Sequence, residues 1–491
     1  MPDASPHRRP NILFILIDDM GYADLGCYGS SFYETPNLDR LAAEGLRFTD
    51  GYAACPVCSP TRASLMTGKY PATVGITNFI PGNAWGKLMG VPYFYELPKG
   101  ETTVASALRD AGYATAHVGK WHLGGPDRYP HHCGFDTNIA GQDWGAPKHG
   151  YFSPYGLDTM SDGPGGEYLT DRLTDETIAL VDRYAESPEK PWFVNLCHYA
   201  VHTPIQAPAD LVAKYEKKAA DLGIDPDGDL VEGDHFTCLH KADQRIVRRT
   251  RQSHPTYAAM VENLDTNLGR LFDALKRNGQ WDNTLILFTS DNGGLSTAEG
   301  SPTCNAPLCE GKGWMYDGGV REPWLAHWPE RIQPGETTDA VITSPDLFPT
   351  LLEVAEADPL PDQHVDGKSF APALLGEAFD RGPIFWHYPH YSNQGDTPAC
   401  SVRDGRYKLI EWFEDGRIEL YDLVADIGEA HNLADTMPDV RDRLHGQLKA
   451  WRDEVGAKIP DVNPDYDAML AGSMPSPNGH GVLPPIPGGD H

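Results

Sequence analysis

Short apolar runs recur along the chain, and each of them ends abruptly in polar residues. The four clearest runs cover residues 11–17, 113–118, 192–197 and 284–289. Successive apolar residues without alternation are typical of strands buried on both faces of a parallel sheet. The polar groups that follow these runs are Asp18-Asp19, Lys120-Trp121-His122, His198 with His202, and Asp291-Asn292. Because ligands of open α/β sheets bind outside the carboxyl ends of the strands, we expect these groups to form one site.

Helix signals alternate with the apolar runs. Threonine and proline begin, and glycine ends, predicted helices at about residues 35–45 and 102–112, and another begins at Ser344-Pro345. Residues 255–278 form a longer amphipathic stretch. This alternation predicts an α/β fold with a doubly wound, mostly parallel sheet in a first domain of residues 1–375.

The pattern changes after residue 375. Four short β-type runs cover residues 384–387, 399–403, 407–412 and 418–421, with turn residues at Asp404-Gly405 and Asp415-Gly416. They predict a small antiparallel subdomain over residues 376–458, closed by a helix at about 438–455. The tail, residues 459–491, is rich in proline and glycine, so we expect it to wrap the surface or to be loose.

Oxygen-bearing residues follow two of the runs. Asp18, Asp19, Asp291 and Asn292 are a hard, all-oxygen set of candidate metal ligands, and the chain lacks the Cys and His spacing typical of zinc sites. Calcium fits better than magnesium, because calcium accepts carboxylates and amides in irregular geometry. The alternative interpretation is that both segments are turns, which Asp, Asn and Gly favour.

Cys58 begins the segment Cys58-Ser59-Pro60-Thr61-Arg62, which continues into a short predicted helix. Ser59 is a candidate N-cap and Pro60 suits the first helical position. The N-terminus of a helix favours an anion, so an anionic substrate could dock beside the cysteine. The alternative is that Cys58 is an ordinary buried thiol, since free cysteines are among the most buried residues.

The segment that begins at Cys58 resembles the signature of type I sulfatases, members of the alkaline phosphatase-like superfamily. In that family a maturation enzyme oxidises the cysteine to formylglycine, the catalytic aldehyde. The resemblance covers about residues 10–432 and is weakest over 209–254. It implies one calcium ion held by Asp18, Asp19, Asp291, Asn292 and position 58. It also implies that the catalytic residues are Cys58, Arg62, Lys120, His122, His202 and Lys312.

The chemistry that the resemblance implies is the hydrolysis of a sulfate ester to an alcohol and inorganic sulfate. One hydroxyl of the hydrated aldehyde at position 58 would attack sulfur, and His202 with Lys312 would protonate the leaving alcohol. His122 would then deprotonate the second hydroxyl, which expels sulfate. Two alternatives stay open: a phosphonate or phosphodiester hydrolase that uses the same aldehyde, and a non-catalytic anion-binding protein with an unmodified Cys58.

The substrate pocket is the least determined part of the site. Aromatic and polar clusters suggest candidate lining residues, which are Trp85, Asp143, Trp144, His387 and His390. Aromatic faces beside hydrogen-bonding groups suit a sugar ring, so we expect a sulfated carbohydrate as substrate and aryl sulfates as surrogates. The alternative is that these aromatic residues pack at joints between subdomains.

Composition limits the partners. The chain has 491 residues, 40% of them hydrophobic, and a formal net charge of -30. This charge argues against nucleic acid and anionic membranes as partners, because both require a basic surface, and it favours a small or sparsely sulfated substrate. No signal peptide or long apolar span is evident, so we expect a cytoplasmic protein. The nine cysteines are expected to be mostly free thiols, although Cys304 and Cys309 are close enough in sequence to pair.

Overall fold

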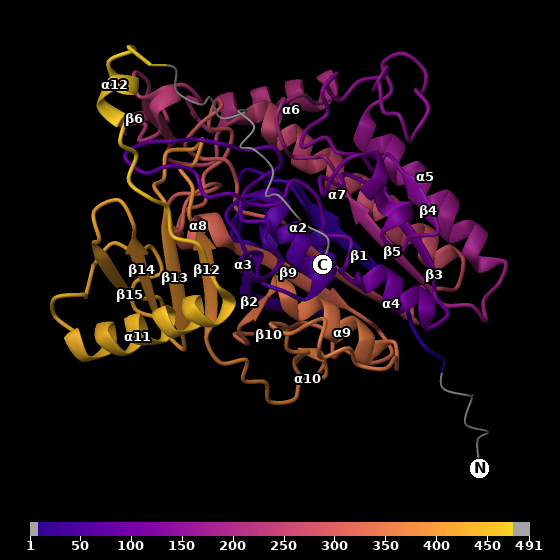
Figure 1. The fold of residues 1–491 in the computed structure, drawn as a ribbon. Coiled ribbons are helices and arrows are strands. Elements are labelled where there is room, and N and C mark those ends of the chain that lie inside the picture. Colours follow the sequence, from indigo (N-terminus) through magenta and orange to yellow (C-terminus); the bar gives the residue numbers. More distant parts are fainter. Residues whose placement is uncertain (1–7, 475–491) are drawn as a thin grey trace.

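The computed structural model describes residues 8–474 and is built around one large, mostly parallel β-sheet (Figure 1). Its strands are β1 (Asn11–Ile17), β2 (Leu46–Tyr52), β3 (Ala114–Gly119), β4 (Thr137–Ile139), β5 (Trp192–Cys197), β8 (Thr284–Ser290), β9 (Arg321–His327), β10 (Glu336–Thr338) and β11 (Ile342–Thr343). They lie in the order β10-β2-β9-β8-β1-β5-β3-β4, with β11 paired to β2. The four predicted apolar runs are therefore the neighbouring strands β8, β1, β5 and β3.

Strand β1 lies at the centre of the sheet, parallel to β5 on one side and β8 on the other. All seven of its residues are buried. Leu13, Ile15 and Ile17 enter the core on one face of the sheet, whereas Ile12, Phe14 and Leu16 enter the core on the other. From Ile12 to Ile17 the strand is apolar on both faces, as a sheet covered on both faces requires.

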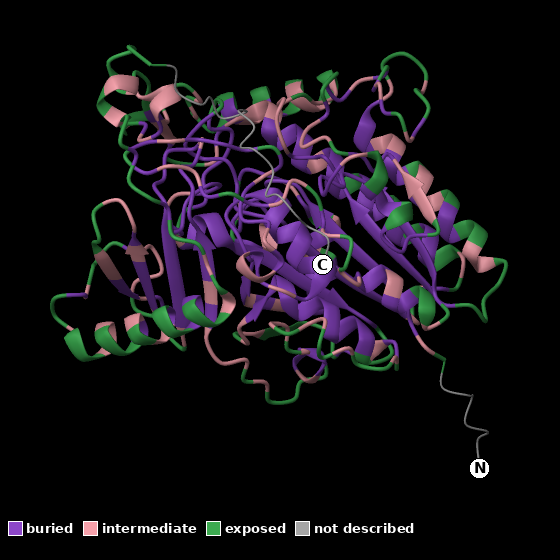
Figure 2. Cartoon of the chain, in the orientation of Figure 1, coloured by how far each residue is buried: buried purple, intermediate pink, exposed green. Residues whose placement is uncertain are grey.

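Helices cover both faces, which confirms the doubly wound α/β fold. One face carries α1 (Pro36–Ala43), α5 (Leu169–Ala185), α6 (Ala209–Asp221) and α7 (Pro255–Arg277). The other carries α2 (Cys58–Thr67), α3 (Pro71–Val74), α4 (Val104–Asp110), α9 (Leu347–Val354) and α10 (Ala371–Leu374). Figure 2 shows the buried sheet between these layers, with exposed residues on the outer sides of helices such as α5.

Local sequence explains where several helices begin and end. Thr103 caps α4: the Ser106 N–H donates to Thr103 Oγ1 at 3.1 Å, and the Thr103 N–H donates to Ser106 Oγ at 3.1 Å. Proline occupies the first position of α1 and α7. Gly68, with φ of 70°, ends α2 in the left-handed conformation that glycine adopts without strain.

Five strands of the large sheet were not predicted, namely β2, β4, β9, β10 and β11, and β9 is the most informative of them. Strand β9 runs antiparallel to both of its neighbours, β2 and β8. Its sequence begins with Arg321 and Glu322, which interrupt the apolar pattern. Both side chains are buried, so the strand occupies an interior position without an apolar run to reveal it.

The C-terminal part forms a second, smaller sheet, as predicted. Strands β12 (Ile384–Tyr388), β13 (Ala399–Asp404), β14 (Tyr407–Trp412) and β15 (Ile418–Asp422) pair antiparallel in sequence order. Helix α11 (Pro438–Val455) packs across it, with Leu444 and Leu448 against Val402 and Leu409. In Figure 1 this sheet and α11 lie beside the large sheet, on the side of α8 (Asp317–Val320).

The stretch that least resembles the sulfatase family contains helix α6 and a hairpin of β6 (Leu230–His235) and β7 (Arg245–Arg249). A 3-10 turn, η4 (Leu239–Lys241), connects these two strands. The described part of the tail includes α12 (Tyr466–Leu470) and lies against residues 86–89, because Met89 N donates to Asp461 O at 2.8 Å and Asn463 N donates to Lys87 O at 2.8 Å. The rest of the predicted tail, 475–491, lies outside the described residues.

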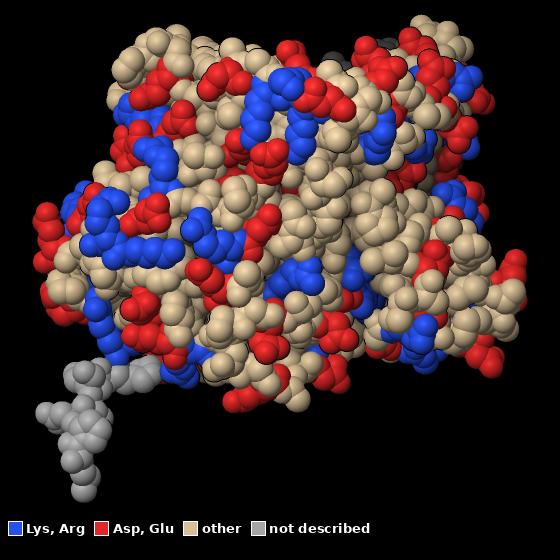
Figure 3. All heavy atoms as spheres, turned by 180° about the vertical axis from the view of Figure 1, so that it is seen from behind, with Lys and Arg blue, Asp and Glu red and all other residues tan. Residues whose placement is uncertain are grey.

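The surface and the cysteines add two observations. On the face shown in Figure 3, acidic and basic side chains are interspersed. All nine cysteines, including Cys304 and Cys309, are free thiols. Within residues 8–474, no helix combines the length and apolar character needed to cross a membrane.

Candidate active site

The predicted site residues gather at the carboxyl ends of the four central strands. Asp18 and Asp19 follow β1, and Asp291 follows β8, where its N–H donates to Ile17 O at 3.0 Å. Lys120 follows β3, with its N–H donating to Cys197 O of β5 at 2.8 Å. Adjacent parallel strands therefore bring together residues that are far apart in sequence.

Three carboxylates and three cations form the buried centre of the site. Lys120 Nζ donates to both oxygens of Asp18, at 2.8 and 2.7 Å. The Arg62 Nε–H donates to Asp291 Oδ2 at 2.9 Å, and Lys312 Nζ donates to Asp19 Oδ2 at 2.7 Å. When all six groups are ionised their charges balance, so a divalent cation would leave the centre positive and suited to an anionic substrate.

The centre has an oxygen atom free to act as a metal ligand. The Asn292 side-chain amide donates to Asp19 Oδ1 at 2.8 Å, but its buried Oδ1 has no hydrogen-bond partner within the described chain. A buried polar atom without a partner is costly, and a cation would satisfy it. Together with Asp18, Asp19 and Asp291 it completes an all-oxygen set that fits a hard divalent ion.

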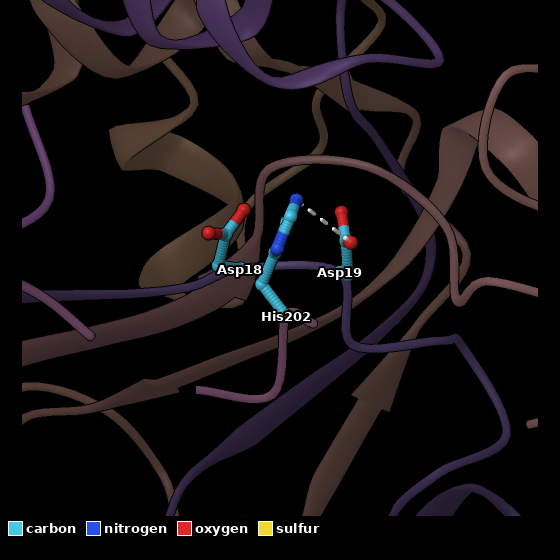
Figure 4. A group of neighbouring side chains, drawn as sticks. All are labelled: Asp18, Asp19 and His202. Atoms are coloured by element: carbon cyan, nitrogen blue, oxygen red, sulfur yellow. Dashed lines mark ion pairs between the residues drawn. The ribbon is translucent and has the colours of Figure 1, made fainter. Parts of the chain in front are cut away.

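His202 also lies close to this set. One ligand atom each from Asp18, Asp19 and His202 lie within 4.8 Å of one another (Figure 4). However, His202 Nδ1 faces Thr203 O at 2.8 Å, and a carbonyl can only accept, so Nδ1 carries the proton. The lone pair of Nε2 then accepts from Lys312 Nζ at 3.0 Å. His202 is therefore already engaged by a lysine, and the oxygen set is the better candidate metal site.

Burial and neighbouring charges shift the pKa values of these groups in different directions. Burial raises the pKa of Asp18, although Lys120 opposes it. At Asp19 burial acts in the same sense, but Lys312 and His202 outweigh it and hold the pKa of this carboxyl below its usual range. Burial, reinforced by Lys312, lowers the pKa of His202 to about 4. A divalent cation would further favour the ionised carboxylates.

Cys58 is the first residue of α2, and Val57 is the N-cap. The expectations that Ser59 caps this helix and that Pro60 is its first residue are wrong: Pro60 is the third residue, and the Ser59 hydroxyl makes tertiary contacts instead. It donates to His122 O at 3.0 Å and accepts from Ile80 N at 3.1 Å. These bonds fix the start of α2 against the loop that carries His122.

The side chain of His122 points a free nitrogen at Cys58. Its Nε2 contacts Ile80 O, so this nitrogen carries the proton and Nδ1 keeps its lone pair. Nδ1 lies 3.3 Å from Cys58 Sγ. Burial, with the charge of Lys120, lowers the pKa of His122 well below its usual range, which keeps the ring neutral. A neutral imidazole in this orientation can accept a proton from a group at position 58.

A cavity of about 620 Å³ opens onto this centre. Cys58, His122, His202 and Lys312 all line it. The other polar or charged side chains on its wall include Lys148, Thr203, Lys241, Glu299, Asn393 and Gln394. The cavity is large enough for a sugar unit with its neighbouring groups, and Cys58 forms part of its wall.

None of the five predicted substrate residues lines this cavity. Trp85 donates its indole N–H to Asn83, and Trp144 stacks on His149. Asp143 accepts a bond of 3.4 Å from the Tyr129 hydroxyl. His387 Nε2 contacts Lys458 O at 2.9 Å, and His390 Nε2 lies 2.8 Å from Thr77 Oγ1. Aromatic composition identified packing positions near the pocket, while Gly145 and Ala146, which follow Trp144, form part of its wall.

Sequence reasoning missed the residues that do form the outer wall. Lys241 lies in the turn between β6 and β7, where no family motif is present. Glu299, Asn393 and Gln394 come from loops, and Lys148 follows the Trp144 cluster. Their position depends on how long loops fold back over the sheet, for which the chain carries no periodic signal.

Comparisons with known proteins agree with this geometry. A family model described as Sulfatase matches residues 10–357. A second, described as N-sulphoglucosamine sulphohydrolase, C-terminal, matches residues 310–454. The chain belongs to the sulfatase family. It is therefore a sulfuric ester hydrolase, and the family implies a metal ion and a formylglycine in the acidic centre described above.

Individual relatives cover nearly the whole sulfatase chain. Human arylsulfatase A is 33% identical, with 92% of this chain and 89% of the relative covered. Human N-acetylgalactosamine-6-sulfatase is 32% identical, with 82% and 72% covered. The crystal structure of Ps i-CgsB in complex with k-i-k-neocarrahexaose is 28% identical, with a TM-score of 0.73 and 95% and 98% covered. A phosphonate monoester hydrolase of Agrobacterium radiobacter, 23% identical with a TM-score of 0.63 and 91% and 96% covered, shares the fold.

Proposed function

We propose that this sulfatase removes sulfate from a sulfated carbohydrate, using formylglycine made from Cys58 and one calcium ion. The observation that carries the proposal is the contact between Cys58 and the unprotonated nitrogen of His122, at 3.3 Å, in the wall of a cavity beside buried cations. An unreactive structural thiol needs no such base. A maturation enzyme would have to act on the chain before it folds, because Cys58 is only 4% exposed.

Calcium at Asp18, Asp19, Asp291 and Asn292 would lower the pKa of a hydroxyl at position 58 and offset negative charge on the sulfate. Arg62, Lys120 and Lys312 contribute fixed positive charge to the same centre. Their side chains are buried and held by carboxylates, so they need little reorganisation when the transition state forms. When the sulfur of the substrate lies beside position 58, these cations would stabilise the negative charge on the sulfate oxygens.

Two proton transfers fall to two different histidines, both of which line the cavity. His122 Nδ1 faces position 58, so it is placed to take a proton from a hydroxyl there. For the other transfer, Lys312 donates to His202 Nε2 at 3.0 Å, and both residues line the cavity. The Lys312–His202 pair holds a proton that can pass to the leaving alcohol.

The carbohydrate part of the proposal rests on the cavity and on the relatives. The names of the relatives include an N-acetylgalactosamine-6-sulfatase and a complex with neocarrahexaose. Around the cavity, Glu299, Asn393 and Gln394 supply carboxylate and amide groups of the kind that bind sugar hydroxyls. An aryl sulfate should serve as a surrogate, because the buried centre contacts only the sulfate end.

The test is mass spectrometry of the tryptic peptide 48–62, from protein co-expressed with a formylglycine-generating enzyme. This peptide contains both Cys55 and Cys58, so fragmentation distinguishes the two. We expect loss of sulfur at Cys58 alone, and turnover of p-nitrophenyl sulfate that Cys58→Ala reduces by about 10⁴-fold or more. Cys55→Ala is the matched control and should remain active. Full activity of Cys58→Ala, or faster turnover of an aryl phosphonate than of the sulfate, would refute the proposal.

A further inference from the structure

Two lysines on the cavity wall have no part in the reaction described above. Lys241 and Lys148 both line the cavity that contains Cys58. Within residues 8–474, no carboxylate forms an ion pair with either of them, whereas Lys120 and Lys312 at the centre are each paired with an aspartate. The outer cavity therefore carries positive charge that the protein itself leaves uncompensated.

The ammonium groups of Lys241 and Lys148 contact only uncharged groups, a carbonyl oxygen and aromatic rings, among the described residues. Lys241 Nζ donates to Asn393 O at 2.7 Å and lies 5.0 Å from the centre of the Phe236 ring. Lys148 Nζ lies 4.6 Å from the centre of the Trp144 ring. These contacts restrict the two side chains without neutralising their charge. A ligand would therefore meet partly ordered cations, which lowers the entropy cost of binding.

Glu299 is the one carboxylate among the described residues of the wall, and its hydrogen-bond partners are neutral side chains rather than Lys241 or Lys148. Glu299 accepts from the Gln394 side-chain amide at 3.2 Å and from the Thr203 hydroxyl at 3.4 Å. Thr203 is next to His202, so Glu299 lies on the side of the Lys312–His202 pair. It is placed to accept hydroxyl groups of a sugar, and it forms no ion pair with Lys241 or Lys148.

We propose that Lys241 and Lys148 form a subsite for a second anionic group, a sulfate or a carboxylate, on the alcohol part of the substrate. The inference rests on the proposed function, because it deepens the substrate of the same site. The sulfate that is cleaved occupies the buried centre, so a second anion needs cations of its own. Charge-assisted hydrogen bonds to Lys241 and Lys148 would supply them. A net charge of -30 would otherwise disfavour such a substrate.

Binding to the Cys58→Ala chain tests the subsite without turnover. Titration calorimetry would compare three disaccharides that share one sulfate: one without further charge, one with a second sulfate, and one with a uronate carboxylate. We expect at least one dianionic ligand to bind more tightly than the monoanionic ligand. Lys241→Gln should weaken that ligand by about tenfold to a hundredfold. The ligand that responds identifies whether sulfate or carboxylate is recognised.

Two controls make the result specific. Lys241→Arg should retain the preference, and Lys449→Gln, which removes an exposed lysine from α11, should leave all three affinities unchanged. Equal affinities for the three ligands, or equal losses for all of them in Lys241→Gln and Lys148→Gln, would overturn the subsite. Failure of the proposed function is distinct: the modified wild-type protein would then fail to hydrolyse p-nitrophenyl sulfate.

Discussion

Two buried clusters in this chain have the same composition, three carboxylates and three cations, yet only one of them faces a cavity. The catalytic cluster consists of Asp18, Asp19, Asp291, Arg62, Lys120 and Lys312. The second, which we call the joint cluster, consists of Asp50, Asp317, Glu429, Arg321, Arg403 and Lys408. Their difference shows what distinguishes a reaction centre from a structural contact.

The joint cluster connects the two sheets. Lys408 of β14 pairs with Asp317 at 2.8 Å and with Glu429 at 3.0 Å. Arg403 of β13 pairs with Asp50 of β2 at 2.6 Å. The Tyr52 hydroxyl donates to Asp317 at 2.9 Å, and its ring lies 5.1 Å from the Arg403 guanidinium carbon. The charged members of this cluster therefore pair with one another across the two sheets.

The catalytic cluster differs in three respects. It has a buried amide oxygen, Asn292 Oδ1, without a partner in the described chain. It adjoins a cavity, and it lies beside Cys58, the proposed nucleophile position, which faces the neutral ring of His122. Buried ion pairs occur in both clusters, and in both their burial costs desolvation energy. Charge pairing alone is therefore no sign of function. The cavity, and the neutral base that faces Cys58 in its wall, mark the site.

The largest expected effect on turnover comes from removing His122, the base that faces position 58 in the catalytic cluster. His122→Ala removes the nitrogen that faces Cys58, and a positioned base is worth about 10²–10⁴-fold in rate. We expect a burst of released alcohol, about one equivalent per chain, followed by a stall, because the first step does not need this base as much as the second. Rapid-mixing kinetics with p-nitrophenyl sulfate would show it. A burst in His202→Ala and none in His122→Ala would reverse the two roles, and the absence of a burst in both variants would contradict the hydrate mechanism.

The same substitution in both clusters separates metal binding from stability. Asp291→Asn should lower the calcium content, measured by elemental analysis, to background, because it removes a charged ligand and the closest ion-pair partner of Arg62. Asp50→Asn in the joint cluster should keep the calcium and lower only the free energy of unfolding. Equal calcium content in the two variants would contradict the metal assignment.

Breaking the joint cluster should affect stability rather than chemistry. Lys408→Met removes a fully buried cation and leaves Asp317 and Glu429 with fewer partners. Removing one member of a buried ion pair costs about 3–5 kcal/mol, which urea denaturation would measure. The kcat of the folded fraction should stay close to the wild-type value. A large loss of kcat at unchanged stability would show that the joint cluster acts on the catalytic centre.

The two clusters also differ in how far the sequence predicted them. Asp18, Asp19 and Asp291 directly follow buried apolar strands, so strand order and the rule for parallel sheets brought them together. The joint cluster had no such signal: Asp317 begins the one-turn helix α8, and Arg321 begins the antiparallel strand β9. Its contacts depend on how the second sheet docks on the first, which hydrophobic periodicity does not encode.

The cavity shows the same limit. Motifs identified Cys58, His122, His202 and Lys312, all of which line it. The predicted aromatic residues, such as Trp85 and Trp144, lie outside its wall, and loops that the pattern left unassigned supply the outer wall instead. Loop conformation is set by many weak long-range contacts, so composition indicates only the neighbourhood of such residues.

The smallest expected effect is a pH dependence within the joint cluster. Burial, which Lys408 opposes and Asp317 reinforces, raises the pKa of Glu429 to about 7, from an ordinary value of 4.5. The folded state therefore holds a proton that the unfolded chain releases between these values. The stability that this proton contributes is fully present below about pH 4.5 and is lost as the pH rises through 7, by at most about 1.4 kcal/mol per pH unit.

Glu429→Gln, which cannot ionise, should remove this contribution to the pH dependence of the free energy of unfolding. Urea denaturation at pH 5, 6, 7 and 8 would measure it: relative to the variant, the wild-type protein should lose stability up to about pH 7 and little beyond. Glu454→Gln is the matched control, an exposed glutamate on α11, and should keep the wild-type slope. If the wild type and Glu429→Gln ran parallel across this range, Glu429 would already be ionised in the folded protein. The joint cluster would then match the catalytic cluster in charge as well as in composition, and the differences left would be the cavity, the unpartnered amide oxygen and the neutral base that faces Cys58.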